Sequence, residues 1–112
     1  MKALPKINYP ELNADALECL EEVLGGMLEL DTKCQGSEFK MLNPRRVDHD
    51  FGSFSINSTT GRWADFAEDD ERARGGDVIS LVAYLRDLSQ GQAARQLRDF
   101  LGAMADNRGG QP

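Results

Sequence analysis

The chain has 112 residues, 40% of them hydrophobic and 29% charged, which fits one globular domain and is too short for a catalytic domain plus an accessory one. No apolar run approaches the roughly 18 residues of a membrane helix, and the first residues lack a secretion signal, so we expect a cytoplasmic protein without membrane contact. The formal net charge of −6 argues against nucleic-acid binding by the whole surface, because such binding rests on Lys and Arg.

The charged residues are unevenly distributed along the chain. Residues 11–31 contain seven acidic residues and no Lys or Arg. Residues 39–63 contain mainly basic residues, namely Lys40, Arg45, Arg46 and Arg62 against Asp48 and Asp50. The sequence therefore predicts an acidic N-terminal helix and a mildly basic centre.

Two cysteines and one histidine cannot supply a closed four-ligand Cys/His zinc site, which normally shows two close ligand pairs. The spacing of Cys19 and Cys34 does not suggest a disulfide framework either. We therefore expect reduced thiols, no structural metal and no cofactor.

The first third of the chain predicts a helix followed by a hairpin. Asn13 is a good N-cap for a helix over residues 13–24, in which apolar residues recur at helical spacing until Gly25-Gly26 ends it. Residues 27–32 and 38–42 then predict two strands around a Gly-containing loop. Asn43-Pro44 ends the second strand, because proline lacks a ladder donor.

A second hairpin is the strongest local signal. Polar and apolar residues alternate over residues 53–57, and residues 62–66 return after a turn in which Gly61 takes a positive φ. Asp77 then caps a helix over residues 78–88 that covers the sheet. Ser89 and Gln92 form the capping box of a last helix that ends at Leu101.

These elements predict an α+β fold in which a small antiparallel sheet of about four strands packs against about three helices. We expect a single domain over residues 1–104. Residues 105–112 are polar and Gly-rich, which predicts a flexible tail or a linker.

Four phrases in this order carry a resemblance to a known family: Asn43-Pro44-Arg45-Arg46, Gly52-Ser53-Phe54, the run from Gly61 to Ala67, and Gly75-Gly76-Asp77. Together they resemble the N-terminal zinc-ribbon domain of bacterial and phage DNA primases, and are most similar to its zinc-less version in phage and plasmid primase-helicases. The similarity extends over about Leu12 to Leu101. It implies a zinc-ribbon-like sheet without metal.

At the places that match the four zinc ligands of the family stand Leu42, Arg45, Asp65 and Glu68. One guanidinium and two carboxylates thus replace the residues that would hold a dication. Our hypothesis is that Arg45 pairs with Asp65 or Glu68 and joins the Asn-Pro turn to the end of the hairpin by charge.

The resemblance implies a non-catalytic accessory domain that contacts single-stranded template DNA weakly during primer synthesis. Its partner would be a primase catalytic domain or a helicase domain, in the same chain or a separate one. The candidate DNA-binding residues are Lys40, Arg45, Arg46, His49, Arg62 and Trp63.

Each candidate also has a plain alternative. Trp63 either stacks on a base or packs in the core, and its place in a strand favours the core. Arg45 is either structural, as proposed above, or a phosphate contact. For three further candidates an ordinary solvated side chain is as good an explanation as a phosphate contact, namely for Lys40, Arg46 and Arg62. His49 in an acidic loop is more readily explained as an exposed side chain without a role.

We expect no enzymatic activity and no small-molecule substrate. The only dense acidic cluster is consecutive in a loop, whereas two-metal phosphoryl transfer needs carboxylates that converge from separate elements. An alternative function is a protein-interaction module with a primase-like shape. In that role the acidic first helix would bind a replication protein or block a basic DNA-binding groove.

Overall fold

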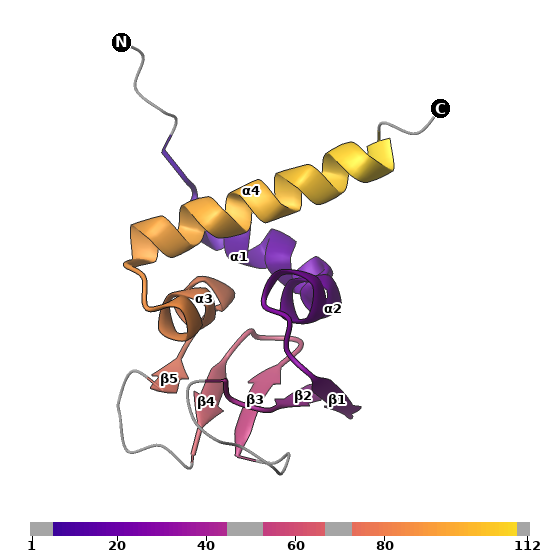
Figure 1. Cartoon of the computed structure of the whole chain (residues 1–112), viewed down its shortest axis with the longest axis vertical. Helices are drawn as coiled ribbons and strands as arrows, with labels where there is room; N and C mark the ends of the chain where they lie inside the picture. The colour runs from indigo at the N-terminus through magenta and orange to yellow at the C-terminus, as the bar shows by residue number, and fades with distance from the viewer. Residues whose placement is uncertain (1–5, 45–52, 67–72, 110–112) are drawn as a thin grey trace.

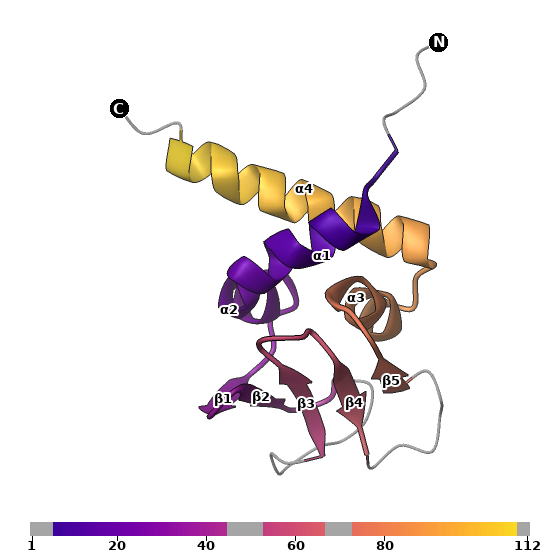
Figure 2. The same cartoon turned by 180° about the vertical axis from the view of Figure 1, so that it is seen from behind.

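The computed structural model describes residues 6–44, 53–66 and 73–109, and the side chains of this set up to Asp106. It confirms the predicted α+β class. A layer of helices lies on one side of an antiparallel sheet, with α4 crossing the helical layer on the side away from the strands (Figures 1 and 2).

Most helix bounds differ somewhat from the sequence-based expectation, whereas the start of the helix at residue 78 agrees with it. The helical elements are α1 (Tyr9–Glu18), α2 (Leu20–Glu22), a π-helical turn η1 (Val23–Met27), α3 (Val78–Arg86) and α4 (Gln90–Gly109). The first three follow one another almost without a break, so the predicted single N-terminal helix is a helix with an irregular end.

The predicted N-cap at Asn13 is wrong. Asn8 caps α1, because its side-chain oxygen accepts a hydrogen bond from the backbone N–H of Glu11 (3.1 Å), and Pro10 lies in the first turn, where its missing N–H costs nothing. Asn13 instead accepts a hydrogen bond from the backbone N–H of Ile79 (3.0 Å). It therefore satisfies an N-terminal donor of α3, a long-range role that local sequence does not reveal.

The predicted end of this helix at Gly25-Gly26 is also wrong. Both glycines lie inside η1, and the residue with a left-handed backbone is Glu29, at φ 56°. The chain then turns toward the sheet with Met27 and Leu30 buried in the core. Residues 27–31, predicted as part of a strand, thus form the exit from the helical layer.

The sheet has five strands within the described residues, one more than predicted. They are β1 (Thr32–Gln35), β2 (Glu38–Met41), β3 (Phe54–Asn57), β4 (Trp63–Asp65) and β5 (Arg74–Gly75), in that spatial order and each antiparallel to the next. At two residues, β5 is too short to give a recognisable alternation of polar and apolar residues.

The second hairpin is confirmed. Gly61 has φ 77°, as expected for the left-handed position of the turn. The side-chain oxygen of Asn57 accepts hydrogen bonds from the backbone N–H groups of Thr59 (2.8 Å) and Thr60 (2.9 Å). An Asx-type contact therefore holds the turn in shape.

The caps of the last two helices are confirmed, but the end of α4 is not. Asp77 and Ser80 form a capping box at the start of α3. Ser89 and Gln92 form the expected reciprocal hydrogen bonds at the start of α4. The last helix continues past Leu101 to Gly109, so residues 105–109, predicted as a tail, are helical. One glycine at position 102 costs only about 1 kcal/mol, which the good helix formers after it offset.

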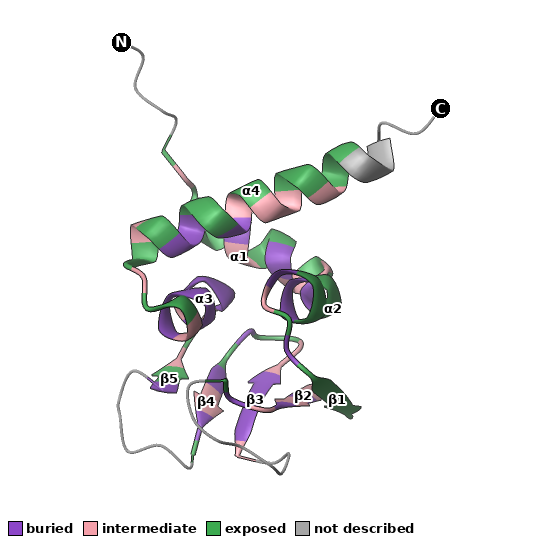
Figure 3. Ribbon diagram, viewed as in Figure 1, coloured by how far each residue is buried: buried purple, intermediate pink, exposed green. Residues whose placement is uncertain are grey.

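The core lies between the helical layer and one face of the sheet, where the buried residues gather (Figure 3). The strands contribute alternate residues to it, and α3 is the most buried helix. The strand residues of the core are Phe39, Met41, Phe54, Ile56 and Trp63. The alternation read from residues 53–57 therefore predicts the inner face of β3 correctly.

Trp63 joins the hairpin to α3. Its indole N–H donates to the backbone oxygen of Asp77 and to the hydroxyl of Ser80, both at 3.0 Å. The ring lies against Gly75, which faces it across β4 and β5. A Cβ at residue 75 would overlap both the indole nitrogen and the Ser80 hydroxyl, so only glycine allows this contact.

We predict that Gly75→Ala lowers the free energy of unfolding by about 1–3 kcal/mol, the usual cost of overpacking a tight site. Gly76→Ala is the matched control, because a Cβ at residue 76 has no atom within 4 Å. Urea denaturation of both variants measures the difference. Equal stability of the two variants would contradict the tight Trp63–Gly75 contact.

Candidate nucleic-acid interface

The two faces of the sheet differ sharply in chemistry. Inward-facing residues of β2, β3 and β4 are buried against the helices. The residues between them point to the opposite side, which we call the open face. Among the described residues no helix covers this face (Figures 1 and 2).

The strand register arranges the open face in three rows that run across the strands. The first row contains Gln35, Glu38, Asn57 and Arg62. The second row crosses all five strands and contains Lys33, Lys40, Ser55, Ala64 and Arg74. The third row contains Ser53 and Phe66, which are joined by a backbone hydrogen bond of 2.9 Å.

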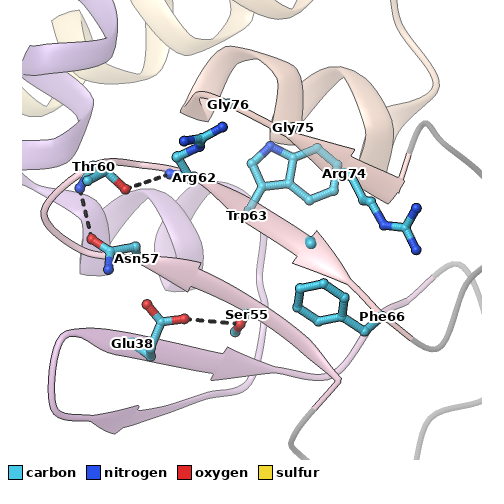
Figure 4. Close-up of a pocket in the computed structure, with 11 residues that line it drawn as sticks. Glu38, Ser55, Asn57, Thr60, Arg62, Trp63, Phe66, Arg74, Gly75 and Gly76 are labelled. Atoms are coloured by element: carbon cyan, nitrogen blue, oxygen red, sulfur yellow. Dashed lines mark hydrogen bonds between the residues drawn. The ribbon is translucent and has the colours of Figure 1, made fainter.

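Small residues in the middle of the second row create a hollow of about 770 Å³ (Figure 4). Its floor is Ser55 and Ala64, because neither side chain rises far from the sheet. Glu38 lies at one side and Phe66 at the other end, while residues of the β3–β4 turn and β5 complete the wall. The hollow is open to solvent.

Among the described residues the open face carries more cations than carboxylates, although the whole chain is acidic. Its cations come from four strands or strand ends and are Lys33, Lys40, Arg62 and Arg74, against the single carboxylate of Glu38 among the strand residues of this face. Arg62 and Arg74 are exposed and line the hollow. This is a suitable arrangement for several phosphates.

Phe66 is the one apolar side chain of the hollow that is largely exposed, at 72% of its surface. A phenyl ring that projects from a basic sheet offers a stacking surface for a nucleobase. In Figure 4 the ring lies on the same side of the sheet as Arg74. Charge and stacking are therefore available within one site.

The predicted DNA-binding residues have different outcomes. Lys40 and Arg62 lie on the open face, as their candidacy required. Trp63 does not fit a stacking role, since it faces the core and exposes only 4% of its surface. It packs edge-on against Phe54, which is the alternative that its strand position favoured. Arg45, Arg46 and His49 lie outside the described residues.

Sequence reasoning missed Lys33, Arg74 and Phe66. A signal existed for Phe66, because strict alternation from Trp63 places residues 62, 64 and 66 on one face. Lys33 and Arg74 could not be found, since β1 was predicted several residues too early and β5 was not predicted at all.

Of the positions that match the zinc ligands of the resembled family, Leu42 and Asp65 are described. Asp65 is fully buried, and the side-chain amide of Asn43 donates to its carboxyl group at 2.8 Å and to the hydroxyl of Tyr84 at 2.9 Å. This Asn43–Asp65–Tyr84 network connects the end of β2 with β4 and α3. Arg45 and Glu68 lie outside the described residues, so their pairing stays a hypothesis, and the described residues contain no cluster of metal ligands.

Comparisons of the chain with protein-family models, with curated proteins and with solved structures found no match. Within the part of the chain that the structure describes, no helix is both long enough and apolar enough to cross a bilayer. The chemistry of the open face is therefore the basis on which a function can be assigned.

We predict that Asn43→Ala lowers the free energy of unfolding by about 1–3 kcal/mol, because it removes a buried donor to a buried carboxyl group. Tyr84→Phe should cost about 0.5–1.5 kcal/mol. The double variant should cost less than the sum, since both changes remove one shared hydrogen bond. Chemical denaturation measures the free energy of unfolding of the two single variants and the double variant. Gln35→Ala on the exposed strand β1 is the control. Additive costs of the two single changes would show that the network does not act as a unit.

Proposed function

We propose that this protein is a non-catalytic domain that binds single-stranded DNA on its open face, as an accessory to a primase catalytic domain or a helicase domain in the cytoplasm. The observation that carries the proposal is the row of cations across the sheet beside an exposed phenyl ring. The resemblance of the sequence to zinc-less primase domains supports the connection with priming.

The second row has suitable dimensions for a short single strand. It crosses five strands, and neighbouring strands lie about 4.8 Å apart, so the row extends over roughly 19 Å. Lys33 and Lys40 lie toward one end and Arg74 at the other. A nucleic-acid backbone that follows this row would meet cations on both sides of the hollow.

The hollow favours a single strand over a duplex. Phe66 offers its ring to solvent, and a base can stack on it only when the base is free of its own neighbours. A base pair inside a duplex exposes its edges rather than its faces. The site therefore fits unpaired bases that turn toward the sheet while their phosphates meet the cations.

The distribution of acidic residues is compatible with this proposal. The exposed carboxylates of α1 and α2 are Glu11, Asp15, Glu18, Glu21 and Glu22. They belong to the helical layer, on the other side of the core from the open face (Figure 1). These five carboxylates of α1 and α2 contribute to the net charge of −6 without standing on the open face.

The same acidic helices support a second candidate, a module that binds a basic surface of a replication protein. Such a partner would contact α1 and α2 and leave the open face unoccupied. The two candidates therefore predict different sensitive residues, which the following experiment uses.

We predict that a fluorescent oligonucleotide binds at about 50 mM salt and loses about 20- to 50-fold in affinity at about 200 mM, as expected for three or four phosphate contacts on a single strand. Arg62→Gln and Arg74→Gln should each weaken binding and reduce the salt slope by about 0.7. Fluorescence anisotropy measures both quantities.

Arg95→Gln is the matched control, because Arg95 is an exposed arginine on α4 in the helical layer. It should leave both affinity and salt slope unchanged. Absence of binding at the lower salt would overturn the proposed function, and an equal effect of Arg95→Gln would show that the open face is not the site.

We further predict that Phe66→Ala weakens oligonucleotide binding by about 1–3 kcal/mol, the usual contribution of one base stacked on an aromatic ring. The salt slope should stay the same, since no charge is removed. The thermal stability should also stay close to that of the parent, because the ring is exposed. Unchanged affinity of this variant would remove the stacking part of the site.

A further inference from the structure

We propose that the hollow on the open face selects guanine among the four bases. This inference rests on the proposed function, since it concerns which base of a bound single strand enters the hollow. The hollow holds one carboxylate, which accepts a hydrogen bond from the floor, and several donors around it, and guanine is the base whose edges match that pattern.

The acceptor is the carboxylate of Glu38. The hydroxyl of Ser55 donates to one of its oxygens at 3.2 Å, so the carboxylate is drawn from β2 over the floor of the hollow on β3 (Figure 4). An ionised carboxylate has several acceptor sites, and this one hydrogen bond leaves capacity for a ligand. Its position at the side of the hollow, next to the floor, allows it to meet the edge of a base that lies on the floor.

The donors lie on the other sides of the hollow. Arg74 comes from β5, two strands away from Ser55, which corresponds to roughly 9.6 Å. Arg62 lies near the β3–β4 turn, beside Asn57. The side-chain oxygen of Asn57 accepts from the turn, so the amino group is the part of that amide which can serve a ligand.

Guanine satisfies this arrangement better than any other base. Its N1–H and 2-amino groups are adjacent donors, which a single carboxylate can accept together, while O6 and N7 are acceptors for an arginine. Adenine and cytosine offer a carboxylate one amino group next to an acceptor nitrogen. Thymine offers one N–H between two carbonyl oxygens, which a carboxylate repels.

The space between Glu38 and Arg74 also suits a purine. The floor of Ser55 and Ala64 has no large side chain, and Phe66 borders the hollow at one end with its ring exposed. A base on this floor therefore has the carboxylate on the β2 side and Arg74 on the β5 side. Selectivity would come from Glu38, and general affinity from the cations.

The test uses a short fluorescent oligo(dT) in which one central position is dT, dG, dA, dC or deoxyinosine, titrated at about 50 mM salt. The dG oligonucleotide should bind about tenfold tighter than the dT one. Deoxyinosine keeps O6, N7 and N1–H but lacks the 2-amino group, so most of the gain should disappear.

Glu38→Gln keeps the shape of the side chain and can still accept from Ser55, but a neutral amide cannot accept both donors of guanine. In this variant the ratio of dG to dT affinity should fall to near one. Affinity for all oligonucleotides can rise because a negative charge is lost, so the ratio is the measure. Glu18→Gln on α1 is the charge control and should keep the ratio of the parent.

The outcomes separate this inference from the proposed function. Equal affinity of the parent protein for dG, dT and deoxyinosine oligonucleotides would overturn guanine selection while leaving single-strand binding intact. Absence of binding to every oligonucleotide would overturn both. If Glu38→Gln does not fold, as judged by circular dichroism, the deoxyinosine comparison on the parent protein still decides.

Discussion

The rest of the structure depends on one buried polar contact, the hydrogen bond from Asn43 to the carboxyl group of Asp65. A fully buried carboxyl group is costly unless neighbouring groups satisfy it, and Asn43 and Tyr84 lie in the same network. The contact fixes three elements to one another, because the residues come from the end of β2, from β4 and from α3. Contacts on the core side of the sheet thereby fix the position of β4.

A second contact on the same strand has the same effect. Trp63 donates its indole N–H to the start of α3, and Asp65 is linked to Tyr84 of the same helix through Asn43. Because successive side chains of a strand point to opposite faces of the sheet, Arg62, Ala64 and Phe66 then lie on the open face. The backbone that carries the cation, the small floor residue and the exposed ring is thus positioned by interactions on the opposite side of the sheet.

The parts of the fold that could be predicted from the sequence are those with a strong local cause. The second hairpin depends on Gly61 and alternation, and the starts of α3 and α4 depend on Asp77 and on Ser89 with Gln92. Local signals failed where a distant residue decided the outcome. Asn13 accepts a hydrogen bond from the start of α3 instead of capping its own helix. Gly25 and Gly26 lie inside a π-helical turn instead of ending the helix.

The candidate site was predictable only in part for the same reason. Lys40 and Arg62 belong to strands or strand ends that the sequence indicated, and the structure brings them to one face. Lys33 and Arg74 reach that face only through the register of β1 and β5, which is a property of pairing across the sheet. Trp63 was a plausible stacking residue by type, but its place in the alternation of β4 directs its side chain to the inner face, next to its cross-strand partner Ile56.

The separation of an acidic helical layer from a basic sheet also gives the molecule an electric dipole. Beyond a Debye length of about 8–10 Å the charges are largely screened, and a polyanion experiences little besides a weak repulsion by the net charge. Closer in, the exposed carboxylates of α1 and α2 repel a polyanion and the cations of the open face attract it, so an approach with the sheet leading is favoured over one with α1 and α2 leading. Under the proposed function, the acidic helices α1 and α2 would disfavour encounters in which they, rather than the sheet, meet the nucleic acid.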